Sequence, residues 1–242
     1  MKENKNQRQP QFPWIVALAG ILLGLLLSLL AVWADYESTS YGFSRRAQAP
    51  LGGLTCPVFL GRNESGRVSL KISNPTDRNL SPGVRTEIST AGEPVSEVEA
   101  ILLAPGEQRT LQRTVGPENV DLGMFIFVDA LVYSVYPMPD RETTCGILVL
   151  PIANGTYPLI LGTLLSILFM AVGAYLSYKS DLPSRRSHSL FFLVIATLLA
   201  MMLGYIGLWF AALLLILICL LTMLHSAGEF FSLQHQREMQ RK

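Results

Sequence analysis

Apolar and polar residues follow two different patterns along this chain. Residues 14–33 form an uncharged apolar run with a Trp at each end, and residues 158–178 form a second uncharged run. About twenty residues at roughly 1.5 Å each span the core of a bilayer as a helix, and Trp favours the membrane interface. The two runs therefore predict transmembrane helices over residues 14–34 and 158–178.

The last apolar run, residues 190–224, is too long for one crossing. As a single helix it would measure about 52 Å, well beyond the roughly 30 Å of a bilayer core. Gly204 and Gly207 predict a tight reversal inside it. The expected segments of this part are a loop over 179–189, helices over 190–206 and 207–227, and a tail over 228–242.

Between residues 54 and 157 the apolar residues recur with a period of two, which is typical of strands. Turn-forming Asn, Pro and Gly residues separate these runs about every ten residues, and the run at 124–136 is apolar on both faces. This spacing predicts a β-sandwich over residues 54–157. The expected strands cover residues 54–60, 67–73, 84–88, 98–102, 109–115, 124–136 and 143–150, with Val98, Ala100 and Leu102 forming the apolar face of the fourth.

Two short motifs lie about thirty residues apart in this region. One strand ends in Ser73-Asn74-Pro75, and Leu103-Ala104-Pro105-Gly106-Glu107 follows later. With these motifs, residues 54–150 resemble the immunoglobulin-like domains of bacterial surface proteins, including the CARDB type. The buried Trp of antibody domains is missing, because all three Trp residues lie at the apolar runs. The resemblance implies a sandwich that binds or spaces other proteins.

The segment before the sandwich, residues 35–53, shows no hydrophobic period and predicts a linker, with Arg45 and Arg46 in a solvated loop. Two interpretations of the first apolar run remain open. It is a retained anchor, or a signal peptide cleaved after Ala34. An h-region usually runs only about 7 to 15 residues, which favours the anchor. Both interpretations place the residues after Ala34 outside the cytoplasm.

The positions of the basic residues predict the topology. Nine Lys and Arg residues lie outside residues 36–157. They are Lys2, Lys5, Arg8, Lys179, Arg185, Arg186, Arg237, Arg241 and Lys242. All nine fall on segments that a four-span arrangement with both termini inside places in the cytoplasm. We therefore expect a multi-pass protein of the cell membrane, with a cytoplasmic tail at 1–13 and residues 35–157 extracytoplasmic.

The cysteines follow this topology. Cys56 falls in the first expected strand and Cys145 in the last, on the side of the membrane where disulfides persist. We expect a bridge between them, which would close a loop of about 90 residues and stabilise the domain by roughly 4 to 5 kcal/mol in the chain-entropy model. Cys219 lies in an apolar run and is expected to be a buried small hydrophobe.

The sequence shows little catalytic chemistry. Residues 35–157 contain no His, which excludes Ser-His-Asp triads and His-based zinc sites there. The carboxylates of this region are expected on solvated strand faces: Glu97, Glu99, Asp129 and Asp140. No charged residue lies inside an expected span, which disfavours transport. A net charge of +1 gives no general basic surface for nucleic acid. We expect no enzyme activity, no metal and no cofactor.

His188 and His225 fall near the same cytoplasmic edge of the expected spans. They are interpreted first as interfacial residues at helix ends, and second as haem ligands. Small residues recur at a spacing of four on two spans and predict close helix packing. They are Gly20, Gly24, Ala196, Ala200 and Gly204. Substitutions such as Gly24→Ile and Ala200→Leu are expected to weaken assembly.

These observations favour a membrane protein with four transmembrane helices and an extracytoplasmic all-β immunoglobulin-like sandwich inserted between helices 1 and 2. The first functional hypothesis is a non-enzymatic accessory or scaffold subunit. Its partners would be the lipid bilayer and other integral membrane or envelope proteins, without nucleic acid. The alternatives are a ligand-binding membrane sensor and a component of a haem-containing membrane enzyme or transporter.

Overall fold

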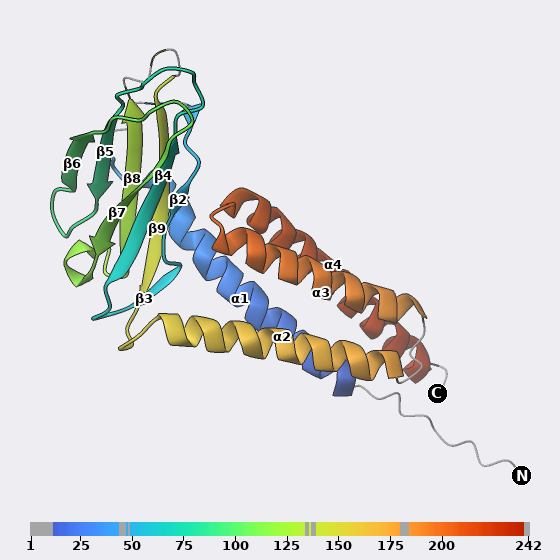
Figure 1. The fold of residues 1–242 in the computed structure, drawn as a ribbon. Helices are drawn as coiled ribbons and strands as arrows, with labels where there is room; N and C mark the ends of the chain where they lie inside the picture. Colours follow the sequence, from blue (N-terminus) through green and yellow to red (C-terminus); the bar gives the residue numbers. More distant parts are fainter. Residues whose placement is uncertain are drawn as a thin grey trace, which may run out of the picture. The chain divides into compact units, whose positions relative to one another are not determined.

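A computed structural model describes residues 12–43, 47, 49–133, 136, 139–179 and 184–239. Figure 1 shows the order of its helices and strands. They are α1 (Phe12–Ser40), β1 (Ala49–Pro50), β2 (Leu54–Thr55), β3 (Phe59–Gly61), β4 (Gly66–Ser73), β5 (Gly83–Ile88), β6 (Val95–Ala100), β7 (Gln108–Val115), the 3-10 helix η1 (Pro117–Asn119), β8 (Phe125–Tyr133), β9 (Arg141–Leu150), α2 (Thr156–Lys179), α3 (Ser184–Tyr205) and α4 (Trp209–Met239). Arg45 and Arg46 lie outside the described residues, as do 1–11 of the expected N-terminal tail, 180–183 of the expected loop and 240–242 of the expected C-terminal tail.

The chain forms two compact units. The helical unit comprises Met1–Leu29, Ile160–Gly204 and Phe210–Lys242, and the sandwich unit comprises Leu30–Leu159 with Tyr205–Trp209. Among the described residues, four helices are long and apolar enough to cross a membrane, which fits a membrane protein. The expectation of four long apolar helices and a β-rich region is therefore confirmed for the described residues.

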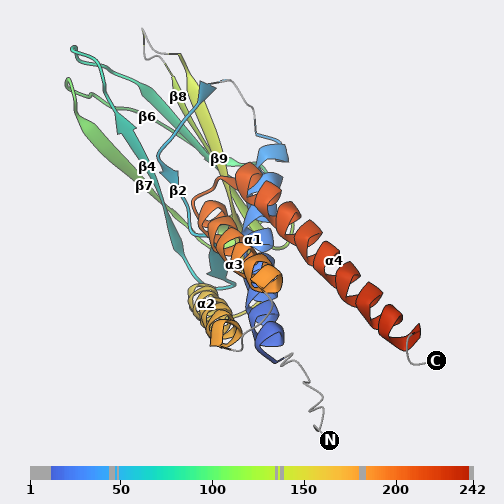
Figure 2. The same ribbon diagram turned by 90° about the vertical axis from the view of Figure 1, so that its right-hand side faces the viewer.

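In the part of the sandwich that the structure describes, the strands form two sheets. One has the strand order β1-β9-β8-β5-β6, with β3 also pairing with β9, and the other has the order β2-β4-β7. Figure 2 shows β2, β4 and β7 as one layer and β8 and β9 in the other. Alternate side chains of each strand face the space between the sheets, because successive residues of a strand point to opposite faces. The buried core there includes Leu70, Val84, Val128 and Ile147.

The strand β8 is buried on both faces, as its sequence predicts. Ile126 and Val128 belong to the core between the sheets. Phe125 and Phe127 alternate with them and lie on the opposite face, where the ring of Phe125 stacks edge-on against Trp33 of α1 at 5.3 Å. The last turns of α1 therefore cover the face of the sheet that a free sandwich would expose to water.

Because α1 packs on this face, the linker expected over residues 35–53 is wrong at its start. Helix α1 does not end at residue 34 but continues to Ser40. The backbone N–H of Gly146 in β9 donates to the Asp35 carboxylate at 3.1 Å, and the Ser38 hydroxyl lies 3.3 Å from that of Thr144. A side chain at Gly146 would collide with the carbonyl of Ala34. Contacts with β9 thus stabilise a helical end that lacks a hydrophobic period.

The first expected strand, 54–60, is divided. Its beginning, β2, pairs with β4 in one sheet, whereas β3 pairs in parallel with β9 in the other. Cys56 lies between these two strands rather than inside one. The chain changes sheets at this point, which a period of two cannot reveal because both halves follow it.

The apolar face expected at 98–102 is also wrong. Val98 and Leu102 are both 62% exposed, and Ile101 and Leu103 are buried instead. The strand β6 ends at Ala100, and Leu103 then forms an isolated bridge with Leu80. A shift of one residue moves every side chain to the other face, so this change of pairing reverses the expected burial.

In the helical region, α3 ends at Tyr205 and α4 begins at Trp209, so the long apolar run is divided. Gly207 between them has a φ of 78°, a conformation that favours glycine. Helix α4 continues to Met239, beyond the expected end at residue 227, so most of the expected tail 228–242 is helical. The reason is local, because residues 229–239 contain no Gly or Pro to stop the helix.

Candidate interaction sites on the sandwich

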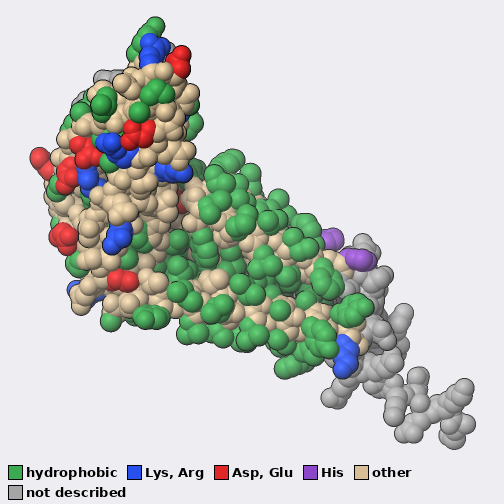
Figure 3. All heavy atoms as spheres, viewed as in Figure 1, with side chains coloured by type: hydrophobic (Ala, Val, Ile, Leu, Met, Phe, Trp, Pro, Cys, Tyr) green, Lys and Arg blue, Asp and Glu red, His purple; other side chains and the backbone are tan. Residues whose placement is uncertain are grey.

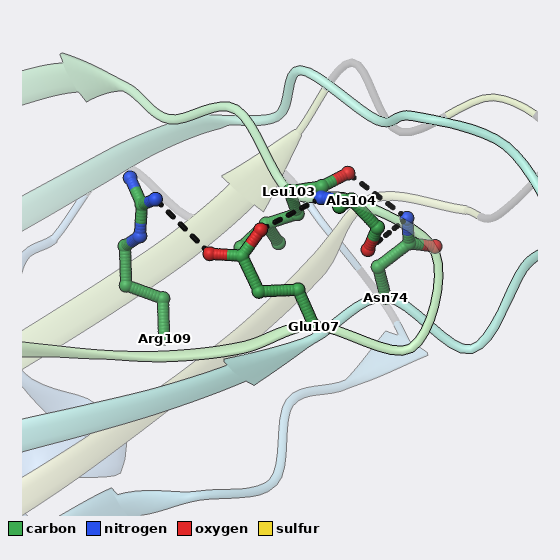
Figure 4. Close-up of polar contacts among 5 residues, drawn as sticks. All are labelled: Asn74, Leu103, Ala104, Glu107 and Arg109. Atoms are coloured by element: carbon green, nitrogen blue, oxygen red, sulfur yellow. Dashed lines mark hydrogen bonds and ion pairs between the residues drawn. The ribbon is translucent and has the colours of Figure 1, made fainter.

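Asn74 links two connections of the sandwich at the end where β4 stops (Figure 4). The residue is 1% exposed, and its Nδ2 donates hydrogen bonds to the carbonyl oxygens of Leu103 at 3.1 Å and Ala104 at 3.0 Å. Nδ2 also donates to the carbonyl of Arg78 at 2.7 Å, and Oδ1 accepts from the N–H of Thr76 at 3.0 Å. A buried amide costs free energy unless it is paired. This set, the Asn74 clasp, holds the β4–β5 and β6–β7 connections together.

The β6–β7 connection turns beside the clasp. Gly106 has a φ of 71°, and the N–H of Glu107 donates to the carbonyl of Ala104 at 3.0 Å. The Glu107 carboxylate accepts from the N–H of Ala104 at 2.8 Å and from Arg109 at 3.1 Å, and these two contacts hold the pKa of Glu107 below its usual value. The two motifs that carry the resemblance therefore form one hydrogen-bonded unit.

A pocket of about 380 Å³ opens at the same end of the sandwich, and residues of both sheets line it. Its apolar wall includes Leu80, Leu103 and Val132, which are all buried. Lys71 of β4 and Arg141 of β9, both exposed, also line it. The pocket thus combines an apolar wall with basic residues, and the Asn74 clasp fixes the position of Leu103 in that wall.

The strand β6 forms an edge of the larger sheet. Among the described residues, β5 is its one strand partner. Val95 is 50% exposed and Val98 62%. The Glu97 carboxylate, between these two residues, lies 2.9 Å from the guanidinium of Arg113 in β7. The Glu99 carboxylate lies 3.0 Å from the same guanidinium. The edge therefore exposes apolar side chains and carries two carboxylates for one cation.

A cluster of ionisable side chains lies on the outer face of the larger sheet. The Arg85 guanidinium lies 3.4 Å from the Glu87 carboxylate, 4.0 Å from that of Asp129 and 3.9 Å from that of Glu142. Asp129 is fully buried. Burial, followed by the nearby Glu142 carboxylate, raises the pKa of Asp129 to about 7, although Arg85 opposes this. The expectation that Asp129 lies on a solvated strand face is therefore wrong.

The structure joins Cys56 and Cys145 in a disulfide, with their Cα atoms 6.5 Å apart and their positions 89 residues apart in sequence. The bond links the point where the chain changes sheets to the middle of β9. Cys219 is a free, fully buried cysteine in α4, and its sulfur lies 4.0 Å from the hydroxyl of Thr197 in α3.

The small residues of the first span lie where helices of this chain approach one another. A Cβ atom added at Gly20 would lie 2.7 Å from the backbone of Ser166 and Met170 in α2. One added at Gly24 would lie 2.9 Å from the side chain of Thr197 in α3. The Ser166 hydroxyl donates to the carbonyl of Gly20 at 2.8 Å. Close packing of α1 is therefore used inside the helical unit.

The remaining candidates lie in α3 and α4. Ala196, Ala200 and Gly204 are buried in α3. His188 is exposed near the start of α3, and His225 is exposed near the end of the apolar part of α4. Haem ligation by these histidines stays a prediction. Whether the small residues also contact another chain stays a prediction too.

Sequence reasoning did not identify the Arg85 cluster or the pocket. Arg85 occupies a polar position in an alternating strand, which indicates a solvated face unless another element covers that face. The pocket residues come from seven separate segments, so no local motif marks them. The one available signal was Asp129, a carboxylate inside the run that is apolar on both faces.

No protein-family model matches the chain, and no curated protein matches its sequence. Among solved structures, the chain is similar to the crystal structure of a CARDB domain from Pyrococcus furiosus determined with di-metal ions. The identity is 17% and the TM-score 0.33, over 40% of this chain and 88% of that one. The solution structure of the same domain gives 19% and 0.32, over 42% and 98%.

A β-glucosidase from Erythrobacter marinus gives 22% identity and a TM-score of 0.30, over 41% of this chain but 15% of that one. The expected resemblance to CARDB-type domains is confirmed at low identity and over about 40% of the chain. Among the described residues, no group of three or more His, Cys, Asp and Glu side chains is placed to hold a metal ion.

Proposed function

We propose that this chain is a non-enzymatic accessory or scaffold subunit of a membrane protein complex, and that its sandwich binds another membrane or envelope protein. The observation that carries this proposal is the exposed edge strand β6. An open edge presents unpaired backbone N–H and C=O groups, and natural proteins usually blunt such edges with Lys, Pro or a bulge. The strand β6, Val95–Ala100, contains neither Lys nor Pro, and its charged residues Glu97 and Glu99 are both ion-paired with Arg113.

A partner would add an extended segment to this edge. In such pairing the backbone supplies affinity, and alternate side chains supply specificity. One row of β6 carries Glu97 and Glu99, with Arg113 as their shared cation. The other row carries Val98 between small residues. The matching segment therefore alternates basic with apolar side chains.

A second copy of this chain fits the edge less well. In antiparallel pairing centred on Val98, Glu97 of one copy would face Glu99 of the other. Like charges directly opposite each other destabilise a strand pair. We therefore favour a different protein as the occupant.

The proposed location is the cell membrane, with both termini cytoplasmic and residues 35–157 extracytoplasmic. The distribution of Lys and Arg supports this orientation. The Cys56–Cys145 disulfide supports an oxidising compartment for the sandwich. Exposed apolar side chains support a lipid-facing or protein-facing role for the helices, whose surface is largely hydrophobic in Figure 3.

The test is purification of the tagged full-length protein from its native membrane in mild detergent, with mass spectrometry of the proteins that accompany it. The decisive variant is Val95→Lys/Val98→Lys, which places positive charge on the edge without altering the backbone. We expect stoichiometric partner chains with the wild type and a loss of at least about tenfold in the variant, since each buried apolar side chain contributes on the order of 1.5 kcal/mol or more.

The matched control is Leu122→Lys. Leu122 is 64% exposed, like Val98, but lies in the turn before β8. The control should retain the partner chains. Equal retention by all three proteins would place the interaction elsewhere, and a solitary wild-type protein would contradict the accessory role.

A further inference from the structure

The pocket at the clasp end of the sandwich has the size and lining of a small-molecule site. Its volume of about 380 Å³ falls within the roughly 300 to 1,000 Å³ of ligand pockets. Leu80, Leu103 and Val132 supply buried apolar wall. A molecule seated there would therefore place an apolar body against this wall.

Arg141 supplies charge at the mouth. It is the first residue of β9, and an even number of positions separates it from Cys145 and Ile147. Its side chain therefore points from the same face of the sheet, toward the other sheet. It lies opposite Val132 in the β8–β9 pairing. The guanidinium is thus attached beside the apolar wall rather than on a distant solvated surface.

Lys71 of β4 lines the pocket through its backbone side, because its side chain alternates with the core residues Leu70 and Ile72 and so stands on the outer face of the smaller sheet. Its N–H donates to the carbonyl of Gly53 at 3.0 Å, and the backbone of Gly53, with a φ of 90°, packs against that of Lys71. Among the described residues, no Asp or Glu lines the pocket, and Arg141 has no ion-pair partner. The pocket therefore carries positive charge that no described carboxylate balances.

We propose that this pocket binds a small amphipathic anion, a carboxylate or sulfonate attached to an apolar body. The apolar wall excludes ions without such a body, because burying a charge without a partner is costly. The Arg141 cation favours an anionic head over a neutral or cationic one, since charge-assisted hydrogen bonds to Arg are strong and directional. This site goes beyond the proposed accessory role and does not depend on it.

The test is titration calorimetry of the full-length protein in lipid nanodiscs with 2-naphthoate, and separately with octanoate. Empty nanodiscs correct for partitioning into lipid. A neutral probe of the same shape, 2-naphthylmethanol, measures the contribution of charge. We expect saturable binding of one anion per chain, at least about tenfold tighter than the neutral probe. Tighter binding of 2-naphthoate indicates a flat aromatic ligand, and tighter binding of octanoate indicates an alkyl acid. Either supports the proposal.

Arg141→Gln should weaken anion binding about tenfold and leave the neutral probe unchanged. Arg141→Lys gives a second variant, which keeps the positive charge and should bind the anion more tightly than Arg141→Gln. The matched control is Arg67→Gln, which removes an exposed cation from β4 outside the pocket and should bind like the wild type. Absence of saturable anion binding, equal affinity for the neutral probe, or equal losses in Arg67→Gln would each overturn the proposal.

Discussion

The sandwich unit and the helical unit use side-chain volume in opposite ways. Between the sheets, large side chains such as Leu103, Val128 and Ile147 fill the space, and a disulfide crosses it. In the helical unit, α1 approaches α2 where side chains are missing, at Gly20 and Gly24. Sheets are separated by about 10 Å of side chains, whereas helices in lipid gain from direct van der Waals contact between backbones.

The difference shows where each unit is vulnerable. Removing a bond or a buried group should damage the sandwich, while adding volume should damage the helical unit. Hydrogen exchange followed by mass spectrometry can test this, because it measures amide protection segment by segment. The strand β8 then reports on the sandwich, and α2 reports on the helices.

The largest effect is expected from removal of the disulfide. Cys56→Ala/Cys145→Ala should lower the unfolding free energy of the sandwich by about 4 to 5 kcal/mol, because the bond closes a long loop in the unfolded chain. Protection of β8 should fall while that of α2 stays constant. Cys219→Ala is the control, since this cysteine lies in α4 and is free. Unchanged protection of β8 in the double variant would show that the bond contributes little.

Adding side-chain volume to α1 should destabilise the helical unit and leave the sandwich unchanged. Gly20→Ile would place a Cβ atom 2.7 Å from backbone atoms of Ser166 and Met170, which cannot rotate away as a side chain can. We expect a loss of about 2 to 3 kcal/mol, seen as reduced protection of α2 with β8 unchanged. Gly228→Ile is the control, since nothing lies within 4 Å of a Cβ added there. Equal tolerance of both changes would contradict close packing of α1 on α2.

A smaller loss is expected at the Asn74 clasp. Asn74→Ala removes one hydrogen-bond donor from each of three buried or partly buried carbonyl groups, which keep their other donors, and should destabilise the sandwich by about 2 kcal/mol. Thermal unfolding of the full-length protein measures it. Thr76→Val is the control, because it removes hydroxyl contacts but keeps the Nδ2 hydrogen bonds of Asn74. A larger loss in Thr76→Val than in Asn74→Ala would disprove the role given to Nδ2.

A gain in stability, rather than a loss, is expected at Asp129. Its folded pKa of about 7 exceeds the unfolded value near 3.8, so the folded state retains a proton that the unfolded state releases between these values. Stability should therefore fall as pH rises from about 4 to about 7 and level off above that. The charged groups facing Asp129 are Arg85 and Glu87 of β5 and Glu142 of β9.

Asp129→Asn resembles the protonated form and should remove this part of the pH dependence. Compared with the wild type, we expect equal stability near pH 4 and a gain at pH 8, with about 4 kcal/mol as the upper limit that a pKa shift of roughly 3 units sets. Melting temperatures at the two pH values measure the difference. A variant that is less stable at pH 8 would show that the ionised carboxylate is favourably paired with Arg85.

Much of the fold could be predicted from local pattern. The four apolar helices and most strands follow from periods that each element carries alone. The strand β4 is an example, because its alternation between Val68 and Ile72 matches its burial. The fourth expected strand failed because its burial depends on a bridge between Leu80 and Leu103, residues that no period connects.

The candidate sites were harder to predict. The two motifs of the clasp could be identified in the sequence, but their hydrogen bonds could not, because Asn74 and Leu103 are far apart in the chain. The pocket depends on the end of the sandwich, where several connections meet. Arg141 precedes the last run of the expected sandwich and carries no signal of its own.

The sequence by itself determined which segments are helical and apolar, which alternate as strands, and which cysteines can pair, because each property depends on neighbouring residues or on residue type. The tertiary structure alone decided that α1 continues to Ser40, that Asp129 is buried beside Arg85, and that Arg141 lies at an apolar pocket. These outcomes depend on which surface covers another, and burial of that kind is a property of the assembled molecule rather than of any segment.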